Sequence, residues 1–151
     1  MGIDIDINQR KFRNEHQKAG INLMYTYGWV MERTKELFAT EDITPQQFNI
    51  LRILRGSHPQ PLSTLQIRER MLDKMSDTSR IVDRLIAKGM VKKATCKTDR
   101  RLVDVIITDK GRKMLERLDQ RQDELDKIIG NLSEKEAATL SDLLDKLRGS
   151  L

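Results

Sequence analysis

The residues best suited to chemistry are basic, and they are concentrated in the middle of the 151-residue chain. Between Arg52 and Arg101 there are 13 Lys and Arg residues against 5 Asp and Glu residues, a balance of +8, whereas the rest of the chain has 15 against 18, a balance of −3. A localised positive field attracts polyanions, and an arginine can donate two parallel hydrogen bonds to a phosphate or to a guanine edge. The alternative is a solvated basic face without a polyanionic partner.

Catalytic and metal-binding chemistry has little support in the sequence. A single cysteine, Cys96, excludes an internal disulfide and a four-cysteine zinc site, and His16 and His58 lie far apart. No nucleophile–base signature or phosphate-binding glycine loop is present, so we expect neither an enzyme nor a cofactor or metal site. No apolar segment approaches the ~18 residues that span a bilayer, so we expect a cytoplasmic protein with no membrane partner.

Helix start signals locate the elements that must position the basic residues. Thr44, followed by Pro45 and Gln47, predicts a helix that begins with a capping box. In this motif the side chain of each of the two residues, Thr44 and Gln47, accepts a hydrogen bond from the backbone N–H of the other. Ser63 and Gln66 have the same spacing and open a second, short helix.

A third helix is expected from Ser76, its predicted N-cap, to Gly89. Glycine is the residue that most easily adopts the left-handed backbone conformation in which many helices end. Polar residues lie off its apolar stripe: Thr78, Ser79, Arg80, Asp83 and Arg84. From Val91 the residues become β-branched and partly alternating, which predicts a two-stranded hairpin. Its strands are "VKKATC" and "RLVDVIIT", with Val103, Val105 and Ile107 on one face, and the polar "KTD" separates them.

Long amphipathic helices are expected at both ends of the chain. We predict one helix over residues 9–39, a second over about 109–130 that Thr108 caps, and a third that Ser133 and Glu136 open with a capping box. The sequence therefore predicts a mainly α (α+β) single domain, residues 1–151, with a hairpin inserted in its second half.

This order of elements is that of a winged helix-turn-helix, in which the hairpin is the wing. The major groove of B-DNA admits one helix, and side chains on the exposed face of that helix read the base edges. The wing can reach the adjacent minor groove, where a narrow groove concentrates negative potential.

The segment "MLDKMSDTSRIVDRLIAKGMVKKATCKTDRRLVDVIITDKGRKML" resembles the MarR family of bacterial transcriptional regulators. The matching features are the Ser-Arg and Arg-Leu pairs of the third helix, "KGMV" after it, "DRR" at the wing and "ITDKG" before the next helix. Because several spaced features occur in one order, and the flanking helices also match, the resemblance covers nearly the whole chain.

The resemblance implies a two-fold homodimer that binds double-stranded DNA at a pseudo-palindromic site. Residues 44–108 would form the DNA-binding lobe, and residues 9–39 and 109–148 would form dimerisation helices. Most members of the family repress promoters, and many are released by a small aromatic or anionic effector that binds between the dimerisation helices and the DNA-binding lobe.

The resemblance also implies roles at the wing. Arg101 matches the arginine that the wing inserts into the minor groove, and Asp99 matches the acid that orients it. The alternation of an extended segment would put these two side chains on one face. Arg100 is a candidate phosphate contact, and an exposed turn with an incidental ion pair is the simpler alternative for all three.

The third helix carries the other candidate DNA contacts, with weaker candidates around it. An ion pair of Arg80 or Arg84 with Asp77 or Asp83 would compete with DNA binding, and Ser76 could serve only as a cap. The candidates in the helix are Ser76, Thr78, Ser79, Arg80 and Arg84, and the candidate phosphate contacts are Lys88, Lys92 and Lys93.

Three aromatic residues of the first helix, Tyr25, Tyr27 and Trp29, could line an effector pocket, although dimer core is the more common role for such residues.

Lysines at 92, 93 and 97 could lower the pKa of the Cys96 thiol, but a structural or incidental cysteine is the simpler interpretation. We therefore expect a sequence-specific transcriptional regulator, with a non-specific or architectural nucleic-acid-binding protein as the alternative.

Overall fold

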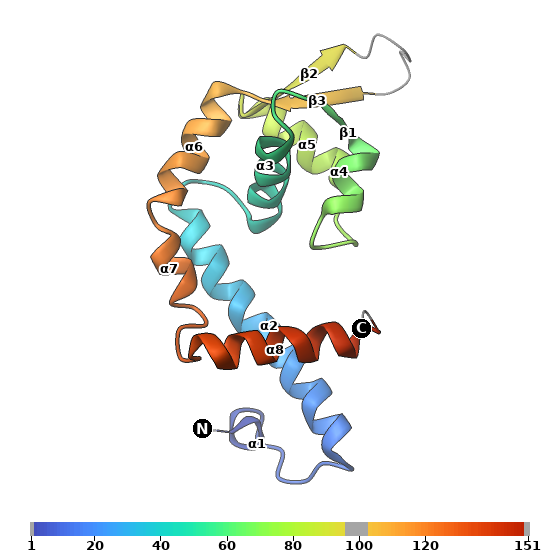
Figure 1. Cartoon of the computed structure of the whole chain (residues 1–151), viewed down its shortest axis with the longest axis vertical. Coiled ribbons are helices and arrows are strands. Elements are labelled where there is room, and N and C mark those ends of the chain that lie inside the picture. Colours follow the sequence, from blue (N-terminus) through green and yellow to red (C-terminus); the bar gives the residue numbers. More distant parts are fainter. Residues whose placement is uncertain (1, 96–102, 150–151) are drawn as a thin grey trace. The chain divides into compact units, whose positions relative to one another are not determined.

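The computed structural model describes residues 2–95 and 103–149 and divides into two compact units (Figure 1). The central lobe comprises residues 35–126, and the terminal unit comprises residues 1–34 and 127–151.

The central lobe is a winged helix-turn-helix, as the sequence predicts. Its strands form an antiparallel sheet in the order β1–β3–β2, with Leu62 opposite Val105 and Val91 opposite Ile107. Figure 1 shows this sheet beside the three helices α3, α4 and α5. The elements of the lobe are the end of α2 (Glu15–Ala39), α3 (Pro45–Ser57), β1 (Leu62–Ser63), α4 (Thr64–Arg70), α5 (Thr78–Ala87), β2 (Val91–Thr95), β3 (Val103–Ile107), α6 (Asp109–Asp119) and α7 (Gln122–Asp126).

One apolar core holds the lobe together. On β3, Val105 and Ile107 are buried as the alternation predicts, whereas Val103 is 44% exposed at the start of the strand, beyond the β1 pairing, which reaches only Asp104. Burying each large apolar side chain contributes about 1.5–3 kcal/mol. The core consists of Phe38, Ile43, Ile50, Leu51, Leu54, Leu62, Ile67, Met71, Val82, Leu85, Met90, Val91, Val105, Ile107, Met114, Leu115 and Leu118.

The predicted caps are largely confirmed. Thr44, Ser63 and Ser133 each form a capping box, and the Thr108 hydroxyl accepts a hydrogen bond from the backbone N–H of Gly111. Gly89 has a φ of +72°, the left-handed conformation expected after α5. These signals are local, so the sequence alone determines them.

The predicted cap of α5 was wrong by one residue. Asp77, not Ser76, accepts the hydrogen bond from the backbone N–H of Arg80, at 3.2 Å. The backbone N–H of Ser76 instead bonds the carbonyl oxygen of Asp73, so Ser76 belongs to the turn before the helix.

Two helix boundaries also differ from the prediction. Helix α2 begins at Glu15 and not near residue 9, because Asn14 accepts a hydrogen bond from the backbone N–H of Gln17 and thereby caps the helix. The helix expected over 109–130 is broken after Asp119, between Leu118 and Leu125, where no apolar residue is available to keep a helical face buried.

The terminal unit contains α1 (Ile3–Asp6), most of α2 and α8 (Glu134–Leu147). Among its described residues, Ile3 is the one buried apolar side chain. Large apolar side chains of the unit are instead exposed: Ile5, Leu23, Met24, Tyr25, Tyr27, Ile129, Leu132, Leu140, Leu143 and Leu147. The described helices include none that combines the length and the hydropathy needed to cross a membrane.

Candidate nucleic-acid interface

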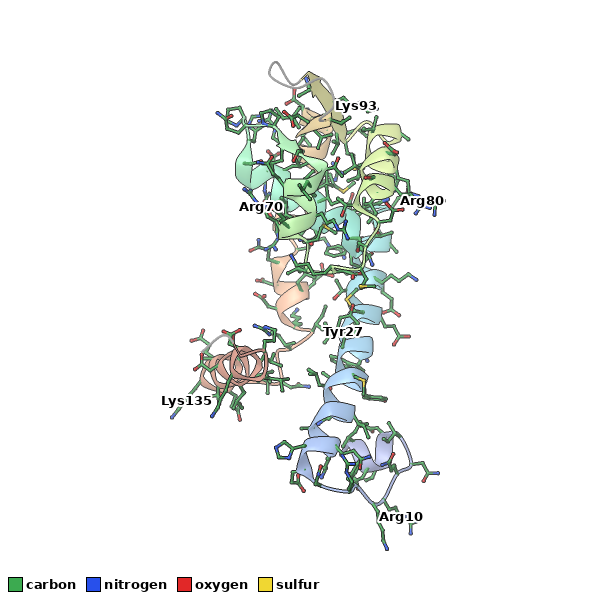
Figure 2. The ribbon with its side chains drawn as sticks, turned by 90° about the vertical axis from the view of Figure 1, so that its right-hand side faces the viewer. Arg10, Tyr27, Arg70, Arg80, Lys93 and Lys135 are labelled. Carbon is green, nitrogen blue, oxygen red and sulfur yellow. The ribbon has the colours of Figure 1, made fainter. Side chains whose placement is uncertain are left out.

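Helix α5 has a buried face and an outward face. Thr78, Val82 and Leu85 point into the lobe, at the three- and four-residue spacing of one helix face. The opposite side consists of exposed residues: Ser79, Arg80, Asp83, Arg84 and Ala87. Figure 2 shows the Arg80 side chain extending from α5 into solvent.

The two outward arginines are not paired within the described part of the chain. Neither the Arg80 nor the Arg84 guanidinium has a hydrogen bond or ion pair there, and Asp77 uses its carboxylate to cap the helix. The competing intramolecular ion pairs that the sequence permits are therefore not formed. With respect to the described residues, both guanidinium groups keep all their donors for another acceptor.

The N-terminal end of α5 has a different environment from its middle. Thr78 is only 4% exposed, so its side chain faces the core of the lobe and not solvent. The hydroxyl oxygens of Ser76 and Thr78 are both buried without a hydrogen-bond partner among the described residues. Ser76 and Arg84 also line an open hollow of about 310 Å³ beside the start of α3.

The three candidate lysines also differ from one another. Lys92 and Lys93 are exposed on β2, where Figure 2 labels Lys93. Lys88 instead donates hydrogen bonds to the carbonyl oxygen of Asp42 and, at 3.3 Å, to Oε1 of Gln47. Its ammonium group is therefore engaged inside the lobe.

The wing begins on a closely packed base. A Cβ atom on Gly111 would come within 2.8 Å of Cγ1 of Ile107, so glycine permits α6 to start directly against the end of β3.

The Arg112 guanidinium, which bonds Asp109, lowers the pKa of that carboxyl, with smaller contributions from the charges of Lys113 and Lys92. The predicted tip residues Asp99, Arg100 and Arg101, and also Cys96, lie outside the described residues.

The aromatic residues of α2 belong to the terminal unit. Tyr25 and Tyr27 are 44% and 60% exposed, and Tyr27 is labelled in Figure 2. Trp29 is half-buried, and the Arg33 guanidinium lies 3.8 Å from the centre of its ring. One face of Trp29 is thus occupied by a cation–π contact.

Asp83 lies in the middle of the outward face, as its place off the predicted apolar stripe indicates. One feature of this surface was not identified from the sequence. The exposed arginines Arg52, Arg68 and Arg70 add positive charge from α3 and α4. The charge balance of the central block includes them, but only the helix orientation reveals which basic residues reach the surface.

Comparisons with known proteins identify the family. The MarR family model matches residues 43–103. The multiple antibiotic resistance protein MarR of Salmonella typhimurium is 31% identical over 108 residues, covering 70% of this chain and 74% of that protein. This chain belongs to the MarR family.

Two further relatives extend the match beyond the central lobe. The HTH-type transcriptional regulator MhqR of Bacillus subtilis is 27% identical over 131 residues, which cover 86% of this chain and 89% of that protein. The crystal structure of a mutant MarR from E. coli in complex with operator DNA has a TM-score of 0.79 and 27% identity, covering 91% of this chain and 98% of that chain.

Family membership confirms the central interpretation of the sequence. The protein is a DNA-binding transcriptional regulator with a winged helix-turn-helix, and MarR-family regulators are not enzymes. The E. coli homologue was crystallised in complex with operator DNA.

Proposed function

We propose that this MarR-family protein binds a pseudo-palindromic DNA site as a homodimer and that α5 of each copy reads base edges in the major groove. The observation that carries the proposal is that the guanidinium groups of Arg80 and Arg84, on the outward face of α5, have no partner among the residues that the structure describes. Ser79 lies beside them, and Lys92 and Lys93 would contact phosphates from the wing.

Support for a homodimer comes from the terminal unit. Its described helices bury almost no apolar surface of their own, while Leu140, Leu143 and Leu147 form an exposed stripe on α8 and Leu23 and Tyr27 are exposed on α2. An amphipathic helix is stable when its apolar face is covered, and a second copy of the chain offers matching faces. Two recognition helices would then meet half-sites about one helical turn, ~10 bp, apart.

For the wing, we propose the roles that the family match implies. Arg101 would enter the minor groove, Asp99 would orient it, and Arg100 would contact a phosphate. On the same grounds we propose that the dimer represses promoters and that a small aromatic or anionic effector releases it. Tyr25, Tyr27 and Trp29 are the aromatic candidates for contact with this effector.

The test is a comparison of two duplexes at a single salt concentration of about 150 mM. Fluorescence anisotropy would measure affinity for DNA from upstream of the gene and for a random duplex of equal length. A specific regulator should prefer the first by about 10³-fold or more. Equal affinities would instead support a non-specific or architectural binder.

Arg84→Ala should lower affinity for the specific duplex by about 1–3 kcal/mol for each half-site, because a guanidinium that reads a base edge is removed. Lys135→Ala, which removes an equal charge from α8, is the matched control, and it should leave that affinity unchanged (Figure 2). Equal effects of the two substitutions would exclude a direct contact by Arg84.

A further inference from the structure

The C-terminal end of α5 is held by a series of directional hydrogen bonds from the junction of β3 and α6. The carbonyl oxygen of Lys88 accepts from Nζ of Lys110 at 2.8 Å, and that of Gly89 accepts from the Thr108 hydroxyl at 2.7 Å. The carbonyl oxygen of Met90 accepts from the backbone N–H of Thr108 at 3.0 Å. Three successive carbonyl groups at the helix end are thus satisfied by one neighbouring segment.

The Lys88 side chain links the same end of α5 to a second segment, the turn between α2 and α3. Its Nζ donates to the carbonyl oxygen of Asp42 and to Oε1 of Gln47, and it lies 3.6 Å from the Asp42 carboxylate. Oε1 of Gln47 also accepts from the backbone N–H of Thr44, as part of the α3 capping box. Lys88 therefore connects the recognition helix directly to the cap of α3.

The N-terminal end of α5 has no comparable polar link among the described residues. Within the described part of the chain, its cap, Asp77, bonds only inside the helix, and the hydroxyl groups of Ser76 and Thr78 have no hydrogen-bond partner. Apolar contacts of Val82 and Leu85 hold the helix against the core, but hydrophobic attraction is non-directional. Hydrogen bonds depend on distance and angle, so the links at the C-terminal end define the tilt of the helix.

A small tilt matters because the DNA-reading side chains lie far from these links. Arg80 precedes Lys88 by eight residues, about 12 Å at 1.5 Å per residue. A rotation of roughly 5° about the C-terminal end would move Arg80 by about 1 Å, which is more than the spread of distances that a hydrogen bond tolerates. Phosphate contacts by long, flexible side chains adjust to such a shift more easily than base contacts do.

We propose that Lys88 is a positioning residue for base recognition and does not contact phosphate. It fixes the tilt of α5 by joining the helix end to the turn at Asp42, so that the outward arginines meet base edges in register. This role rests on the proposed function, because it assumes that α5 reads a specific sequence.

The experiment compares Lys88→Met with Lys93→Met in the full-length protein. Methionine keeps the apolar stem and removes the ammonium group, and Lys93 is an exposed lysine that we assign to phosphate. Fluorescence anisotropy would measure affinity for the operator, which is the specific duplex from upstream of the gene, and for a random duplex. The measurements would cover a series of salt concentrations at a temperature well below the thermal midpoint of each variant.

For Lys88→Met we expect operator affinity to fall about tenfold, the scale of removing a charged hydrogen bond, with random-duplex affinity and the salt dependence unchanged. For Lys93→Met we expect both affinities to fall. The slope of log affinity against log salt should then decrease by about 0.9 for each phosphate that the protein no longer neutralises. Lys88→Arg, which retains charged donors on a long stem, should recover part of the operator preference.

Several results would overturn the inference. If Lys88→Met lowers both affinities and the salt slope as Lys93→Met does, Lys88 contacts phosphate. If neither affinity changes, the links at Lys88 do not position the helix for recognition. A wild-type protein that binds both duplexes equally would instead refute the proposed function itself, and this inference with it.

Discussion

Replacing Leu143 with alanine should weaken the proposed homodimer without unfolding the central lobe. Leu143 lies on the apolar stripe of α8, and 58% of it is exposed in the single chain. In the proposed dimer this surface is covered by the partner, so the substitution removes apolar burial at the interface. By two-fold symmetry the effect occurs twice.

The magnitude follows from the exposed fraction. Full burial of a leucine side chain contributes about 1.5–3 kcal/mol, so covering the remaining 58% contributes about 1–1.7 kcal/mol per copy. Two copies give about 2–3.5 kcal/mol, which corresponds to a roughly 30- to 400-fold increase in the dimer dissociation constant.

Sedimentation velocity over a range of protein concentrations would measure that constant. Ser141→Ala is the matched control, because Ser141 is exposed and lies two residues from Leu143, on the other side of the helix. Circular dichroism would establish that both variants remain folded. A Leu143→Ala protein that dimerises as tightly as wild type would refute the assignment of α8 to the interface, and a wild-type monomer at all concentrations would refute the dimer.

Two further predictions concern the wing and the pH dependence of α8. Arg101→Ala should weaken binding to the specific duplex by about 1–3 kcal/mol per half-site while sedimentation still detects the dimer; unchanged affinity at physiological salt would remove the wing from the mechanism. Hydrogen bonds from the Ser133 hydroxyl and backbone N–H lower the pKa of Glu136 below its ordinary 4.5. The stability from this carboxylate is therefore fully present above pH ~4.5 and is lost as the pH falls through the lowered pKa. In acid titrations, the stability difference between wild type and Glu136→Gln should narrow below that pH, and a constant difference would contradict this cause.

The elements that the sequence predicted correctly are those specified by local chemistry. Thr44, Ser63, Thr108 and Ser133 cap helices because a side chain and a backbone N–H three residues away meet in any chain context. Likewise Gly89 ends α5 because the left-handed conformation favours glycine. For the same reason the order of helices and hairpin could be derived without the structure.

The features that the sequence does not determine depend on tertiary packing. The sequence offers Thr78 as a candidate DNA contact, and only the orientation of α5 against the core reveals that its side chain points inward. It likewise groups Lys88 with Lys92 and Lys93, because the turn that engages Lys88 lies 46 residues earlier in the chain. The two-residue strand β1 is too short for any alternation to predict it.

The carboxylate of Asp83 has a consequence for how the protein searches DNA. It lies on the outward face of α5 between Arg80 and Arg84, and the phosphates of any duplex repel it. If α5 reads base edges as proposed, the amino group of a cytosine at a correct site can donate to it and offset this repulsion, whereas an arbitrary sequence offers no such donor in register. The penalty would then fall mainly on wrong sites. Each encounter with random DNA would become shorter, and the regulator would sample more of the genome in a given time.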